Sequence, residues 1–177
     1  MSESFAATIA RPTTDEYAPS YAGYVAKVPD GDVVATMAMQ ILTTHDLLVA
    51  VDEGRGGYRY APDKWSLREV VGHMADTERV MTYRALRFAR ADPTPLAAFD
   101  ENAYIPPSGF GDRTLASVLA EFESVRAASV ALFGGLPDAA WTRRGQASGK
   151  YVSVRALAWI VAGHERHHLD IIRERYL

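Results

Sequence analysis

Three histidines near the C-terminal end have the spacing that metal chemistry requires. They lie in the segment WIVAGHERHHLDIIRERY, residues 159–176. His164 and His168 are four residues apart, and apolar residues flank them at steps of three and four, which places both on one helix face. Two imidazoles one turn apart form a ready pair of metal ligands. His167 lies on the same side, so His164 and His167 are the rival pair. The flanking apolar positions favour His168.

A buried histidine is often a core residue satisfied by one hydrogen bond. Two on one apolar stripe leave more ring nitrogens to satisfy away from water. A further histidine, His73, falls on the inner stripe of a second predicted helix, with Asp76 three residues later on the same side. Three neutral imidazoles suit Zn²⁺ or Ni²⁺ rather than Mg²⁺ or Ca²⁺. Three protein ligands leave an open position, as in catalytic sites, where an ion activates bound water or a bound thiol, or acts as a Lewis acid.

Residues 164–168 also read H-E-x-x-H, the signature of zinc metalloproteases. Those enzymes take a third ligand from downstream, whereas only nine residues follow His168 and none is a histidine. We therefore reject the protease interpretation and read Glu165 as a solvated helix residue. Asp76, Glu165 and His167 are kept as candidates for groups that surround the ligands, and the sequence leaves any catalytic residue unassigned.

Four amphipathic segments are expected to position these residues. The first begins after Asp30 or Asp32 and ends near Gly54, with His45 just beside its apolar stripe as a surface or boundary histidine. The second begins at Ser66, which forms a capping box with Glu69, and it ends near Ala91 before Asp92-Pro93.

The third segment begins at Thr114 and ends at Gly134-Gly135, and the fourth follows a cap at Ser153. Four charged residues of the middle segments are predicted to face outward: Glu78, Arg79, Glu123 and Arg126. No strand is predicted. These patterns indicate an all-α four-helix bundle.

The depths of the histidines along their helices constrain the topology. His73 lies about two turns from the start of its helix, and His168 about two turns from the end of its own. The two can meet only if those helices are antiparallel, which an up-down-down-up bundle provides and an up-down-up-down bundle does not. Such a bundle needs a long crossover, and the segment 92–113 supplies one. Its prolines and glycines predict that it is not helical.

Composition excludes several classes of function. Hydrophobic residues make up 48% of the chain, charged residues 23%, and the formal net charge is −3. The sequence has no stripe of basic residues that would indicate nucleic-acid binding, and no apolar run is long enough to span a bilayer. No signal sequence is recognised, so we expect a cytoplasmic protein. The chain has no cysteine, so any thiol must come with a substrate. We expect one domain over residues 1–177, with an irregular arm over about residues 1–30.

The segments KWSLREVVGHMADTERV and AGHERHHLDIIRERYL together resemble the DinB/YfiT-like superfamily. The resemblance rests on Trp65, on the G-H-x-x-D-x-E run from Gly72 to Glu78, and on the paired histidines of the last helix. It implies an up-down-down-up bundle with a Zn or Ni ion on three histidines. Carried over residue by residue, these ligands are His73, His164 and His168. Family members are often homodimers.

The resemblance specifies the metal-binding residues more closely than it specifies the reaction. Some members use low-molecular-weight thiols such as bacillithiol or mycothiol as transferases, and others are candidates for metal-dependent hydrolysis. We therefore expect a metal-dependent enzyme acting on a small molecule, with thiol transfer first and hydrolysis as the neighbouring class. The alternative is a non-catalytic metal-binding protein that acts in a stress response or in protein interactions.

Overall fold

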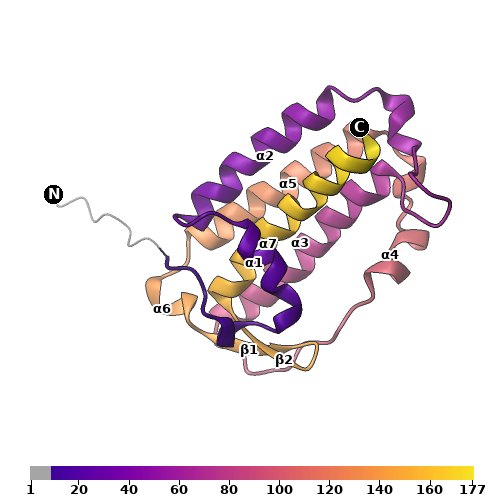
Figure 1. Cartoon of the computed structure of the whole chain (residues 1–177). Helices are drawn as coiled ribbons and strands as arrows, with labels where there is room; N and C mark the ends of the chain where they lie inside the picture. The colour runs from indigo at the N-terminus through magenta and orange to yellow at the C-terminus, as the bar shows by residue number, and fades with distance from the viewer. Residues whose placement is uncertain (1–8) are drawn as a thin grey trace.

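A computed structural model describes residues 9–177, and four long helices form its body (Figure 1). They are α2 (Val33–Val49), α3 (Leu67–Ala89), α5 (Leu115–Gly134) and α7 (Val154–Ile171), which the π-helical turn η5 (Ile172–Tyr176) extends. Each begins after a side chain that accepts hydrogen bonds from the first backbone N–H groups. These caps are Asp32, Ser66, Thr114 and Ser153. All four predicted helices are therefore present.

Two hydrophobic clusters at opposite ends of the bundle show how the helices run. One cluster joins the starts of α2 and α7 to the ends of α3 and α5, through Val33, Val154, Phe88 and Phe133. The other joins the ends of α2 and α7 to the starts of α3 and α5, through Leu48, Leu169, Leu67 and Leu115. Helices α2 and α7 thus point one way and α3 and α5 the other. The up-down-down-up topology is confirmed.

The crossover from α3 to α5 runs along the outside of the bundle (Figure 1). Its expected lack of helix was wrong, because it contains α4 (Glu101–Ser108) and the 3₁₀ turn η4 (Phe110–Asp112). The Asp100 side chain caps α4 by accepting from the backbone N–H of Asn102, 2.9 Å away. The two prolines fall near the end of this short helix, and Gly109, at φ 69°, closes it in the left-handed conformation.

A small hairpin precedes α7 and corrects the prediction that the chain has no strand. Strands β1 (Arg144–Ala147) and β2 (Lys150–Ser153) pair antiparallel through a turn in which Ser148 and Gly149 both have positive φ. Each strand has only four residues, most of them polar, which is too short for the alternating pattern of a strand to be recognised in the sequence. The 3₁₀ turn η3 (Glu53–Gly57) and the one-turn α6 (Asp138–Trp141) complete the loops.

The described part of the N-terminal arm, which was expected to be irregular, packs against α7 and contains short helical segments. It contains η1 (Thr14–Glu16), η2 (Pro19–Tyr21) and α1 (Ala22–Lys27), and residues 14–28 are called the strap below. Buried Glu16 anchors it by accepting from Ser153 Oγ and Arg155 Nε, both 2.7 Å away. Although burial raises the pKa of Glu16, these donors lower it to about 2. Residues 1–8 of the predicted arm lie outside the described residues.

Gly163 sets how closely the strap can approach α7. A Cβ atom at this position would lie 2.0 Å from the carbonyl oxygen of Tyr24. We expect Gly163→Ala to lower the free energy of unfolding by about 1–3 kcal/mol, since the strap must move away. Gly23, in α1, has no heavy atom within 4 Å of the same position. Gly23→Ala should leave stability unchanged or raise it by up to about 1 kcal/mol. Urea denaturation measures the free energy of unfolding of both variants. Equal values would contradict the close packing of the strap on α7 at Gly163.

Candidate metal centre

Three histidines from two antiparallel helices converge inside the bundle, toward the start of α3 and the end of α7. Nε2 of His164 lies 3.1 Å from Nε2 of His73 and 3.0 Å from Nε2 of His168. His73 and His164 are buried, and His168 is partly buried. His167, one residue away, lies outside this group of three. The structure therefore brings together the three residues that were predicted as ligands.

Hydrogen bonding alone does not explain this arrangement. A neutral imidazole nitrogen carries either one proton or one lone pair, so Nε2 of His164 can make one good hydrogen bond but has two close neighbours. Ligands of a tetrahedral zinc ion at the usual Zn–N length would lie ~3.3 Å apart. The observed separations are close to that value, so the nitrogen atoms present fit a divalent transition metal.

Burial keeps the three rings neutral, the form that can bind a cation. It lowers the pKa of His73 to about 4. Burial also lowers the pKa values of His164 and His168 well below the usual range, and the neighbouring imidazoles lower them further. The lone pairs are therefore available at neutral pH.

Aromatic and hydroxyl groups hold the rings in place. Trp65 packs against His73 with ring centroids 4.7 Å apart, and Tyr24 of the strap meets His164 edge-on at 5.4 Å. Thr77 Oγ1 lies 3.4 Å from Nδ1 of His73, on the side away from the cluster. Tyr24 was not predicted at the site, because nothing in the local sequence pattern tells which helix the strap covers.

The residues suggested around the ligands have different environments. Asp76 pairs with Arg79 at 3.2 Å, and its side chain is 27% exposed. His167 packs against Tyr24 at 5.3 Å between ring centroids. His45 is exposed, as predicted, and contacts Glu123 at 2.6 Å. Burial raises the pKa of Asp76. This carboxylate lines neither of the two small cavities that the cluster histidines border, one formed with Tyr24 and the other with Tyr176.

Three charges predicted to be solvated are in fact buried. Arg126 donates to both carboxylate oxygens of Glu78, at 2.8 and 2.7 Å, and to Glu165 at 2.6 Å. None of the three side chains is more than 3% exposed. The prediction failed because each residue taken alone is a surface residue, and only the pairing across helices makes burial possible. Arg79 is exposed, as expected.

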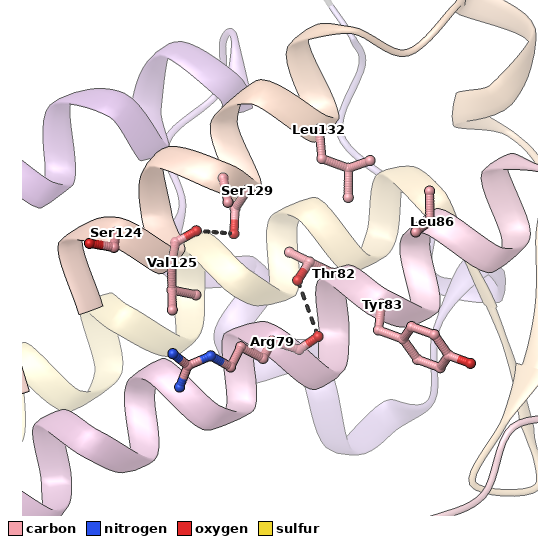
Figure 2. Close-up of a pocket in the computed structure, with 9 residues that line it drawn as sticks. Arg79, Thr82, Tyr83, Leu86, Ser124, Val125, Ser129 and Leu132 are labelled. Carbon is pink, nitrogen blue, oxygen red and sulfur yellow. Dashed lines mark hydrogen bonds between the residues drawn. The ribbon is translucent and has the colours of Figure 1, made fainter. Parts of the chain in front are cut away.

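Two larger surface grooves flank α5 and lie away from the histidines. The groove between α3 and α5 has a volume of about 540 Å³. Figure 2 shows Val125, Ser129 and Leu132 of α5 opposite Thr82 and Leu86 of α3. A similar groove of about 560 Å³ lies between α2 and α5. Neither contains a member of the three-histidine cluster.

The fold and the cluster define an α-helical protein with a metal-type histidine site. Residues 40–172 match the DinB superfamily, and the chain belongs to that family. A comparison with curated proteins finds no match. None of the helices within residues 9–177 has the length and apolarity needed to cross a bilayer.

Two solved structures share the fold. One is titled "YfiT from Bacillus subtilis is a probable metal-dependent hydrolase with an unusual four-helix bundle topology"; it has 18% identity, a TM-score of 0.72, and alignment over 80% of this chain and 82% of that one. The other, the mycothiol-dependent maleylpyruvate isomerase, has 14% identity and a TM-score of 0.67. The match covers 82% of this chain but only 62% of the isomerase. At these identities the likeness concerns the fold.

The lowered histidine pKa values predict that the metal-free protein weakens in mild acid. Below the ordinary pKa of 6.5 the unfolded histidines take up protons while the folded ones do not, until pH approaches the folded pKa, about 4 for His73. The free energy of unfolding should therefore decrease as the pH is lowered, by up to about 1.4 kcal/mol per pH unit for each ring that stays neutral in the folded protein. The carboxylate of Glu16, whose ordinary pKa is 4.5, loses its stabilising charge only at lower pH.

Urea unfolding of chelator-treated protein between about pH 5 and 6.5 measures this slope. His73→Gln removes one of the three rings, so one proton fewer is taken up on unfolding. The slope of the free energy of unfolding against pH should decrease by the contribution of that proton. His45→Gln, at an exposed position, is the matched control. Equal slopes for His73→Gln and the unmodified protein would contradict the assignment.

Proposed function

We propose that this chain is a metal-dependent enzyme whose ion is held by His73, His164 and His168. The observation that carries the proposal is the convergence of three Nε2 atoms, at 3.0 and 3.1 Å, in a setting that keeps the rings neutral. Imidazole ligands favour Zn²⁺ or Ni²⁺. Three protein ligands leave room for a substrate group.

A bound ion would supply Lewis acidity and would lower the pKa of a water or thiol that reaches it. The protein's own residues orient the ligands and limit access of water. Trp65 packs on His73 and Tyr24 on His164, and the Thr77 hydroxyl lies beside Nδ1 of His73. Glu165 is engaged by Arg126 and therefore has no free role as a general base.

For the reaction, we favour transfer that uses a low-molecular-weight thiol, with hydrolysis of a small substrate as the neighbouring class. The chain has no cysteine of its own, so a thiol would come with a cosubstrate. One structural relative is described as a mycothiol-dependent maleylpyruvate isomerase and the other as a probable metal-dependent hydrolase, which supports a thiol cosubstrate and keeps hydrolysis as the neighbouring class. A purely metal-binding protein is the non-catalytic alternative. The cytoplasmic location stays a prediction of the sequence.

Metal content tests the ligand set. Purified protein should carry about one divalent transition metal ion per chain, and His164→Ala should lose it, because two remaining imidazoles hold such an ion weakly. His168→Gln should also lose it. His167→Gln and His45→Ala should retain it. Elemental analysis with circular dichroism on each variant provides the measurement.

Two results would contradict the assignment. Equal metal in His164→Ala and His45→Ala would exclude the cluster as the binding site. Loss of metal in His167→Gln, with retention in His168→Gln, would show that the rival pair on α7 binds the ion.

We also propose that the protein forms a homodimer through the outer face of α5. Small side chains cover this face: Ala116, Ala120, Ser124, Ala127, Ala128 and Ala131 are exposed. The two apolar grooves lie on either side of it, and Figure 2 shows the one between α3 and α5. Exposed Leu42 and Met39 continue the apolar surface on α2, at 56% and 63% exposure. Small residues allow two such helices to approach closely, and a second copy would cover these apolar side chains.

Light scattering during size-exclusion chromatography should give the mass of two chains. Ala127→Arg places a charge at the centre of the proposed interface and should give the mass of one chain. Ala98→Arg, at an exposed position in the crossover, should remain dimeric. A monomeric unmodified protein at micromolar concentration would exclude this interface.

A further inference from the structure

A small cavity lies between α1, α2 and α7, which pack side by side (Figure 1). Its volume is about 170 Å³, and none of the three clustered histidines lines it. Arg166, which does, is two residues from both His164 and His168, so its side chain leaves α7 on the opposite face. We call this space the basic cavity, and its polar lining residues are Lys27, Gln40, Thr43, Arg166, Asp170 and Arg173.

The lining of the basic cavity carries more positive than negative charge. Its one carboxylate, Asp170, is 2.7 Å from the ammonium of Lys27 and 3.8 Å from the guanidinium of Arg173. Arg166 takes part in neither of these ion pairs. Three cationic side chains therefore share one carboxylate, and a small dianion would balance the charge of the lining.

Two buried polar atoms at this cavity lack a partner. Oε1 of Gln40 and Nε of Arg166 accept or donate no hydrogen bond within residues 9–177. Gln40 is only 6% exposed. Its amide nitrogen donates to the carbonyl of Ala162 at 3.0 Å and to Glu165 at 2.9 Å. Because both of these partners only accept, the orientation of the amide is fixed and the unpaired atom is its oxygen.

These unpaired atoms specify the chemistry of a ligand. Arg166 requires an acceptor, whereas Gln40 requires a donor, so a ligand that satisfies both must carry oxyanion oxygens and a hydroxyl. Sulfate carries only acceptors. Hydrogen phosphate, HPO₄²⁻, accepts through its charged oxygens and donates through its P–OH group. Guanidinium groups also pair closely with phosphate oxygens.

We propose that the basic cavity is a binding site for inorganic hydrogen phosphate. Lys27, Arg166 and Arg173 hold the charged oxygens, and Gln40 accepts from the P–OH group. The volume of the cavity is below the range of drug-sized pockets, about 300–1,000 Å³, which suits a single small ion. This site is separate from the three-histidine cluster and goes beyond the proposed metal-dependent function.

A comparison of three anions tests the proposal. Titration calorimetry in mildly alkaline buffer, with sodium chloride keeping the ionic strength constant, measures binding of phosphate, sulfate and methyl phosphate. All three are dianions under these conditions, but only phosphate has an O–H group. Phosphate should bind at least about tenfold more tightly than the others, because they leave the Gln40 oxygen unpaired.

Three outcomes of this comparison would overturn the proposal. The first is that phosphate does not bind. The second is that phosphate and sulfate bind equally, which would mean that only charge is recognised. The third is that methyl phosphate binds as tightly as phosphate, which would identify the ligand as the phosphate end of a larger molecule.

A matched pair of variants locates the site. Arg173 and Arg175 are both exposed and both lie in η5, but only Arg173 lines the basic cavity. Arg173→Gln should weaken phosphate binding by about three- to tenfold, whereas Arg175→Gln, with the same change in net charge, should leave it unchanged. Equal losses in the two variants would show that phosphate responds to the overall charge and not to this cavity.

Two further variants test the groups that lack partners. Arg166→Gln should weaken phosphate by at least about tenfold, since it removes the cation that has no ion-pair partner in the cavity. Gln40→Met removes the acceptor at similar length, so phosphate and sulfate should then bind alike. A preference for phosphate that persists in Gln40→Met would exclude Gln40 as the group that recognises the P–OH.

Chelator-treated protein separates this site from the proposed function, because phosphate is also able to bind a metal ion. Binding to the basic cavity should persist after chelation, since the cluster histidines do not line it. Loss of phosphate binding on chelation would place the anion on the metal and overturn the proposal. If the purified protein holds no metal but binds phosphate, the metal-dependent function fails and the phosphate site stands.

Discussion

The guanidinium of Arg126, buried where the four long helices meet, is the interaction on which the rest of this bundle depends. It extends from α5 to Glu78 of α3 and Glu165 of α7, and it donates to the carbonyl of Met37 in α2 at 3.1 Å. Burial alone would lower the pKa of Arg126, but the two carboxylates raise it above the usual range. Removing one charge would leave the others buried without a partner, which costs about 3–5 kcal/mol. The network therefore requires one relative placement of all four helices.

That placement determines where the histidines lie. Glu78 is five residues after His73 on α3, and Glu165 follows His164 directly on α7. Because one arginine binds both carboxylates, a shift of either helix along its axis would disturb the network and the histidine cluster together. Thr44 and Gln40 of α2 also donate to Glu165, at 2.5 and 2.9 Å. The cluster of three neutral rings is thus supported by a neighbouring buried network in which one guanidinium and two neutral donors bind two carboxylates.

The sequence predicted those features of the structure that depend on a local pattern of residues. Helical periodicity and side-chain caps predicted all four long helices, and the depth of His73 and His168 predicted their antiparallel arrangement. Local patterns do not report pairing between distant segments. Arg126, Glu78 and Glu165 each look like surface residues, and Tyr24 gives no indication that its ring will pack on His164. The crossover was misread for a related reason, since its prolines suggested a chain without helix although an Asp100 cap begins one.

The crossover explains why this topology and this kind of site occur together. In an up-down-up-down bundle α3 and α7 would be parallel, and His73 and His168 would lie near opposite ends. Reversing one pair of helices brings the histidines to the same depth, but it requires a connection as long as the bundle. Such a connection must pass over the surface, and here its short helix α4 lies beside the histidines, with Glu101 and Asn102 in the walls of two hollows. The segment that makes the cluster possible therefore also shapes the space in which a ligand would meet it.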